Sequence, residues 1–181
     1  WDPAQSQWDE MQAALATGAS ITAIVNVANG PGAAFNSDYA NAIQSFRAAG
    51  GKVLGYVYTC YGGTQCSAEV PASRTPSDVL NDAERYAQWY GADGVFLDEM
   101  ASQPSALPYY TTVAQGLRSA HPNWRIVGNP GTAPDAAYLT VTDTLVTYEN
   151  GQASYSSYAA PSWSSSQAPQ RQAHLLYNVG T

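Results

Sequence analysis

The segment GVFLDEM, residues 94–100, runs from apolar residues directly into two acids, Asp98 and Glu99. Its first four residues have the character of a buried β-strand. A carboxylate left at the end of a buried strand costs on the order of several kcal/mol unless it has a partner or a chemical task. The segment therefore predicts a strand whose C-terminal end carries functional acids.

The strand ending at these acids is one of a series of short apolar, β-branched runs that alternate with segments of helical periodicity. This alternation is typical of β/α units around a parallel sheet, whose strands read as continuous apolar runs because both faces are covered. The predicted strands cover residues 21–27, 52–59, 94–99, 125–131, 144–150 and 173–179, and the predicted helices cover residues 38–49, 78–90 and 109–120.

The helices carry recognisable terminal residues. Ser37 is the expected N-cap of the first, and Thr75 and Asp78 resemble a capping box around Pro76 in the second. After Glu149 the chain becomes rich in Ser, Ala, Tyr and Gln, which predicts one or two weak helices and a loop.

Two architectures fit six such strands, namely an open doubly wound sheet and a (β/α) barrel. A barrel normally has eight strands and roughly 250 residues, so a length of 181 residues favours the open sheet. The polar residues favour the barrel, because several different strands end in polar or acidic side chains, as barrel active sites require.

The carboxyl ends of parallel strands open on one face, so their polar residues should meet in one cleft. Acids, amides and aromatic rings together suit a sugar, because rings stack on pyranose faces and amides bond hydroxyl groups. The candidates, in chain order, are Asn26, Asn29, Tyr56, Tyr58, Tyr61, Asp98, Glu99, Asn129, Tyr148, Glu149 and Asn178.

Asp98 with Glu99 on one strand and Glu149 on another supply the minimum for glycoside hydrolysis, which needs one carboxylate as nucleophile or base and another as acid. The same acids could instead cap the following helices or pair with Arg85 or Arg125. Neither a GxSxG elbow nor a phosphate-binding glycine motif is present. A divalent cation held by the three acids is conceivable, but we predict no metal site and no cofactor.

Composition excludes several partners. Seven Lys and Arg against fourteen Asp and Glu give a net charge of −7, which disfavours nucleic acid and anionic membranes. No apolar run approaches the roughly 18 residues of a membrane span. Cys60 and Cys66 flank the glycine-containing loop YGGTQ, which suggests a local disulfide, with two reduced thiols as the alternative. We expect a secreted monomer that binds a polysaccharide.

The succession NVANGPG, GYVYTCYG, GADGVFLDE, YY at 109 and 110, VGNPGT and the acid of TYEN resembles the spherulin-4-like family, glycoside hydrolase family 135. The resemblance extends over nearly the whole chain. It implies a (β/α)8 TIM-type barrel and a secreted endo-α-1,4-N-acetylgalactosaminidase acting on galactosaminogalactan. It also implies that Asp98, Glu99 and Glu149 are the catalytic acids.

Family members typically have a first strand of the form PLYxYP and continue past LLYN into an eighth strand. Neither occurs in this sequence. We therefore expect residues 1–181 to form a single catalytic barrel domain in which the first and last strands are absent.

For the mechanism, we expect Asp98 to attack and Glu149 to act as acid and then base, with Glu99 orienting a hydroxyl or raising the proton affinity of its neighbour. A carboxyl separation of about 5 Å would indicate retention, and about 7–9 Å inversion. Trp163 joins the tyrosines as a stacking candidate. The alternatives are a non-catalytic carbohydrate-binding or coat protein and a metal-dependent deacetylase.

Overall fold

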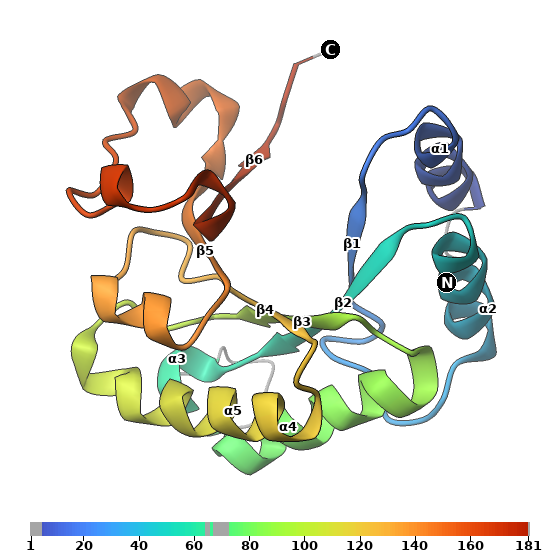
Figure 1. The fold of residues 1–181 in the computed structure, drawn as a ribbon, viewed down its shortest axis with the longest axis horizontal. Coiled ribbons are helices and arrows are strands. Elements are labelled where there is room, and N and C mark those ends of the chain that lie inside the picture. Colours follow the sequence, from blue (N-terminus) through green and yellow to red (C-terminus); the bar gives the residue numbers. More distant parts are fainter. Residues whose placement is uncertain (1–4, 64–65, 67–72, 181) are drawn as a thin grey trace.

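The chain folds into one curled, parallel six-stranded sheet with helices on its convex side (Figure 1). This computed structural model describes residues 5–63, 66 and 73–180. The strands are β1 (Thr22–Val25), β2 (Lys52–Tyr58), β3 (Gly94–Asp98), β4 (Arg125–Gly128), β5 (Thr144–Gly151) and β6 (Gln172–Tyr177). All six lie where the sequence predicts a strand.

The order of the strands decides between the two architectures. Each strand pairs in parallel with the next one along the chain, from β1 to β6. A doubly wound sheet reverses its order at a switch point, so this sequential order excludes it. The described strands form a curled half-barrel in which β1 and β6 rise on opposite sides (Figure 1).

The helices occupy the predicted segments, with two additions, at residues 5–16 and 60–63, and one shift. The α-helices are α1 (Gln5–Ala16), α2 (Ser37–Ala48), the kinked turn α3 (Cys60–Gly63), α4 (Pro76–Arg85) and α5 (Leu107–Ala120). Helix α1 was not expected. The N-cap of α2 is Asn36 and not Ser37, because the Asn36 side chain accepts hydrogen bonds from the N–H groups of Asp38 and Tyr39.

Helix α4 begins with the expected capping box of Thr75 and Asp78. It continues into a π-helical turn, Tyr86–Tyr90, and ends at Gly91, whose φ is 61°. Short 3₁₀ turns make up the remaining regular structure at Pro104–Ala106, Ala136–Thr140, Gln152–Ser157, Ser164–Ser166 and Pro169–Arg171. One or two weak helices and a loop were expected after Glu149, and the structure has the last three of these turns there.

Both faces of the sheet are apolar, as the continuous strand runs predict. The convex face packs against the helices through side chains such as Val57, Val95 and Leu97, which meet Phe46 and Tyr86. The concave face has a smaller cluster of Leu54, Phe96, Val127 and Val146. Alternation along each strand therefore divides its side chains between two cores.

Gly55 permits a close approach of the π-helical turn to the sheet. A Cβ at this position would overlap the ring of Tyr86, which lies directly over β2. The Tyr86 hydroxyl then reaches past β2 to donate to the Val25 carbonyl at 2.8 Å. This contact ties the π-helical turn to β1 and keeps the polar end of a buried ring satisfied.

Candidate active site

Two acids from separate strands meet at the C-terminal edge of the sheet. Asp98 is the last residue of β3 and Glu149 lies near the end of β5. The side chain of Asn129, which follows β4, lies between them. Its Nδ2 donates to Asp98 Oδ1 and to Glu149 Oε2, each at 2.8 Å. Because Asp98 Oδ1 and Glu149 Oε2 accept from the same nitrogen, these two oxygens are at most about 5.6 Å apart.

Asp98 accepts a second hydrogen bond from a tyrosine on the neighbouring strand. The Tyr56 hydroxyl donates to Asp98 Oδ2 at 2.6 Å. Burial, together with the nearby Asp98 carboxylate, raises the pKa of Tyr56 far above its usual range, so the phenol keeps its proton. Each Asp98 oxygen thus has a hydrogen-bond donor, so the carboxyl group is held in one orientation.

Glu99 follows the end of β3 in a left-handed conformation with a φ of 48°. Its Oε2 is buried and has no hydrogen-bond partner among the described residues. Burial, and secondarily the charge of Asp98, raises the pKa of Glu99, while Arg74 opposes this shift. The expected roles of Glu99, which are to orient a hydroxyl or to raise the proton affinity of its neighbour, stay predictions.

Tyr61 completes the group around the acids. Its side chain is 44% exposed. Partial burial and the charges of Glu99, Asp98 and Glu149 raise the pKa of Tyr61, so the phenol lies within electrostatic reach of all three acids. An exposed ring beside carboxylates is suited to stacking on a sugar face.

Backbone strain gathers at the same edge of the sheet. The described residues other than glycine with positive φ are Asn29, Cys60, Tyr61, Glu99 and Asn178. All of them follow the C-terminal end of a strand: β1, β2, β3 or β6. Such conformations cost about 1–3 kcal/mol each and cluster at functional sites.

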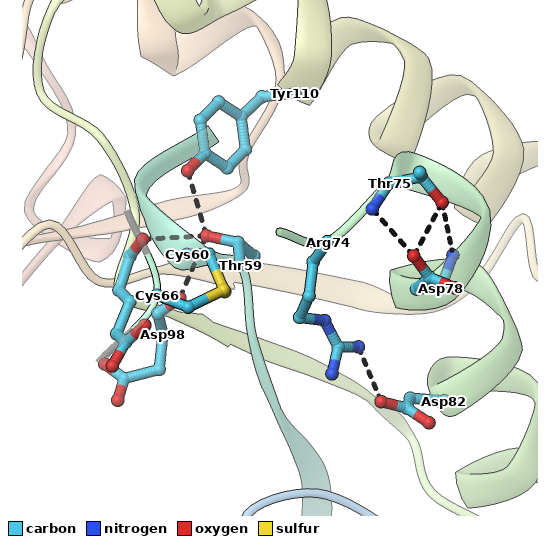
Figure 2. Close-up of a disulfide and its surroundings, with 10 residues drawn as sticks. Thr59, Cys60, Cys66, Arg74, Thr75, Asp78, Asp82, Asp98 and Tyr110 are labelled. Carbon is cyan, nitrogen blue, oxygen red and sulfur yellow. Dashed lines mark hydrogen bonds and ion pairs between the residues drawn. A yellow bond between two sulfur atoms is a disulfide. The ribbon is translucent and has the colours of Figure 1, made fainter. Parts of the chain in front are cut away.

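The expected disulfide joins Cys60 to Cys66 next to this edge (Figure 2). Cys60 directly follows Thr59, whose backbone N–H donates to the Asp98 carbonyl at 2.9 Å. The cross-link therefore begins one residue after Thr59, which binds the backbone of Asp98.

Other predicted site residues have structural contacts of their own. Asn26 accepts a hydrogen bond from the Gly30 N–H at 3.0 Å, so it shapes the turn after β1, where Asn29 also lies. Tyr58 is buried beneath Arg74, whose guanidinium carbon is 3.9 Å from the ring centre. Arg74 in turn pairs with Asp82, toward which it points in Figure 2.

Tyr148 and Trp163 also have structural contacts. Tyr148 pairs with His174 across β5 and β6, and it packs in an aromatic cluster with Tyr155 and Tyr158. Since it precedes Glu149 in an extended strand, its side chain points to the opposite face of the sheet. Trp163 packs against the helical core, and its indole N–H donates to the Pro134 carbonyl at 3.2 Å.

Sequence reasoning missed two residues that contact the backbone at or next to Asp98 and Glu99. Thr59 and Tyr110 are buried, and they bind each other and the backbone beside the acids. Thr59 ends the strand predicted for residues 52–59, and Tyr110 belongs to the YY pair at 109 and 110. Both features were visible in the sequence, but their contact depends on packing between β2 and α5.

Some further features bear on the site. Within the described ranges, no three His, Cys, Asp or Glu side chains are grouped so that they could hold a metal ion. A search of the same residues finds no helix with the length and apolarity to cross a bilayer.

Comparison with known proteins gives related matches in sequence and in structure. The family model for spherulation-specific family 4 matches residues 1–181. Spherulin-4 of Physarum polycephalum is 35% identical over 145 residues, which are 79% of this chain and 41% of the relative. The chain thus matches about two fifths of that protein's length.

The fold matches the crystal structure of Aspergillus clavatus Sph3 in complex with GalNAc, with a TM-score of 0.81 and 24% identity. The match covers 99% of this chain and 76% of Sph3. At this level of identity the similarity concerns the fold, and it extends to the entire half-barrel.

Proposed function

The chain belongs to the spherulation-specific family 4, and on that premise we propose that it is a glycoside hydrolase. The observation that carries the proposal is the Asn129 amide, which joins Asp98 and Glu149 at 2.8 Å each. Retaining glycosidases hold two carboxyl groups about 5–5.5 Å apart, and the largest possible separation of these two oxygens is close to that range.

The geometry suits a double displacement. Asp98, held by Tyr56 and Asn129, attacks the anomeric carbon as the glycosidic C–O bond breaks. Glu149, which is exposed, gives its proton to the leaving oxygen. In the second step Glu149 takes a proton from water, which attacks the same carbon and releases Asp98.

Glu99 has a separate part in this scheme. Its raised pKa keeps a proton on the carboxyl group at higher pH than usual. A protonated carboxyl can donate a hydrogen bond to a sugar hydroxyl or to an acetamido carbonyl. Tyr61 supplies the ring on which the sugar stacks.

The substrate we propose is α-1,4-linked N-acetylgalactosamine in a galactosaminogalactan-type exopolysaccharide, cleaved at internal positions. The GalNAc bound to Sph3 supports this choice. The disulfide supports a secreted enzyme, because such bonds persist mainly in oxidising surroundings. The sequential parallel order supports a single domain with the design of an eight-stranded barrel.

The test is hydrolysis of purified galactosaminogalactan by the wild type, Asp98→Asn and Glu149→Gln. Glu84→Gln, which changes an acid on α4 that pairs with His121, is the matched control. We expect oligosaccharides from the wild type and the control only, and an NMR time course should show the α-anomer first. Equal release by all four proteins would remove the assigned roles. Binding without release would favour a carbohydrate-binding or coat protein.

A further inference from the structure

The turn at Glu99 is what keeps two consecutive acids together. In a continuing strand, successive side chains point to opposite faces. Strand β3 ends at Asp98, and Glu99 turns the chain with a φ of 48°. This conformation is costly for a residue with a side chain, so neighbouring groups have to hold it.

The end of β2 supplies those groups. The Thr59 N–H donates to the Asp98 carbonyl at 2.9 Å, and the Tyr61 N–H donates to the Glu99 carbonyl at 2.7 Å. The Thr59 hydroxyl lies 2.8 Å from the Glu99 carbonyl and 3.0 Å from that of Asp98. The carbonyl groups of Asp98 and Glu99 are therefore both bound by this one segment.

The direction of the hydrogen bonds follows from the atoms involved. A carbonyl oxygen only accepts hydrogen bonds, so the Thr59 hydroxyl donates its single proton to the Asp98 and Glu99 carbonyls, which share it. The Tyr110 hydroxyl, 2.9 Å from Thr59 Oγ1, must then be the donor in that contact. Tyr110 also accepts from the Ala101 N–H at 2.8 Å, just beyond the turn.

The chain of bonds is shielded from water. Thr59 is 0% exposed and Tyr110 is 1% exposed. Figure 2 shows the Tyr110 hydroxyl reaching from α5 to Thr59, on the side where Asp98 lies. Hydrogen bonds are stronger in a buried environment, and an unpaired group there costs about 1–3 kcal/mol.

We propose that Thr59 and Tyr110 are positioning residues, which hold the left-handed turn at Glu99 and so set where its carboxyl group lies relative to Asp98. They act through the backbone of the acids. The catalytic part of this inference rests on the proposed function. The structural part concerns the environment of Glu99 and stands without it.

The first measurement is the pKa of the Glu99 carboxyl, followed by NMR in protein with ¹³C-labelled glutamate. Thr59→Val keeps the side-chain shape and removes the hydroxyl, whereas Thr59→Ser keeps the hydroxyl. The control is Thr142→Val, since Thr142 is 1% exposed and its hydroxyl donates to the Tyr138 carbonyl. We expect Thr59→Val to shift the Glu99 pKa toward its usual value, with Thr59→Ser and Thr142→Val unchanged.

The second measurement is the steady-state hydrolysis of the polysaccharide. Misplacing a catalytic group by about 1 Å can cost roughly 100-fold in rate. We therefore expect Thr59→Val to lower kcat by up to about that factor with little change in KM, and Thr59→Ser to restore it. The control should keep the wild-type kcat.

A folded Thr59→Val protein with the wild-type Glu99 pKa and the wild-type kcat would overturn the inference. If that variant does not fold, Tyr110→Phe removes the other hydroxyl, leaves the ring in the core and is measured in the same way. A wild type that releases no sugar would refute the proposed function alone, because the Glu99 titration would still decide whether Thr59 positions the turn.

Discussion

Asn129 connects the two acids on which the proposed chemistry depends. From the sequence, we expect it to bind a sugar hydroxyl or acetamido group. In the structure its amide is occupied by protein: Nδ2 donates to both carboxylates and Oδ1 accepts from the Gly131 N–H at 3.0 Å. Asn129 lies at the site because β4 pairs between β3 and β5. Its contacts are with Asp98, Glu149 and the Gly131 N–H.

The first prediction concerns this amide. Asn129→Ala leaves Asp98 and Glu149 without their common donor, so we expect kcat to fall by about 100-fold through the loss of preorganised contacts. The measurement is the rate of polysaccharide hydrolysis. Asn41→Ala, on the exposed side of α2, is the control. An Asn129→Ala enzyme with full activity would show that the bridge is dispensable.

The second prediction concerns the stability cost of Glu99. Its folded-state pKa is raised, so the ionised form is penalised on folding, and the penalty grows as pH rises above the unfolded-state value. We expect Glu99→Gln to raise the melting temperature at pH 7. The gain should vanish below about pH 3.5, where the wild-type carboxyl is protonated in both states.

Differential scanning calorimetry at the two pH values measures this effect. Glu10→Gln, at an exposed position of α1, provides the comparison. A lower melting temperature at pH 7 for Glu99→Gln would mean that the charged carboxyl is stabilising and that the assigned environment is wrong. A gain in stability with a loss of activity is the usual trade-off at a functional site.

At the scale of elements, two β/α units use the same device at the opposite edge of the sheet. Asp93 precedes β3, accepts from the Val53 N–H at 2.9 Å and pairs with Arg47 of α2 at 3.0 Å. Asp143 precedes β5, accepts from the Ile126 N–H at 2.7 Å and pairs with Arg118 of α5 at 2.7 Å. Each aspartate joins a strand start to the last turn of a helix.

The third prediction tests this device through Asp93. Burial acts to raise the pKa of Asp93, but hydrogen bonds from Arg47 and the Val53 N–H outweigh it and lower the pKa overall. A lowered pKa stabilises the fold above the unfolded-state value, and this contribution is lost as pH falls through the folded-state value. We expect Asp93→Asn to reduce the free energy of unfolding by about 2 kcal/mol at pH 7.

Urea denaturation at pH 7 and at pH 3 provides the measurement, and the difference from the wild type should shrink at the lower pH. Asp38→Asn, in the exposed first turn of α2, controls for the loss of one negative charge. An equal effect of Asp93→Asn at both pH values would contradict the assigned role of the charge.

At the scale of the whole molecule, the described sheet has two outermost strands, β1 and β6, each with an unpaired side. Large apolar side chains are exposed there, with Ile24 of β1 at 42% and Leu176 of β6 at 39%. Unpaired strand edges with apolar side chains are templates for association with another chain.

The fourth prediction is that Ile24→Lys with Leu176→Lys slows aggregation on heating, because charge at an edge opposes strand pairing. Light scattering during a temperature ramp measures this effect. We expect the melting temperature to change by only a few degrees, since both side chains are partly exposed. Val57→Lys, which places a charge in the core, should unfold the protein. Unchanged aggregation of the edge variant would show that other surfaces drive association.

The sequence alone determined the six strands, three of the helices and the family. Strand positions followed from apolar runs and helix ends from local capping, because both depend on residues within a few positions of each other. The spherulin-4-like motifs identified the family over the whole chain. The acids Asp98, Glu99 and Glu149 could be chosen because each lies at or near the C-terminal end of a strand, and these ends of parallel strands open on one face.

Only the tertiary structure decided which side chains meet. Sequential strand pairing selected the half-barrel over the doubly wound sheet, and the pleat turned Tyr148 away from Glu149. The Asn129–Glu149 and Thr59–Tyr110 hydrogen bonds join residues that are 20 and 51 positions apart in the sequence. The left-handed conformation of Glu99 is likewise held by residues from another strand end. Such contacts depend on register and packing between elements, and no local pattern of residues encodes them.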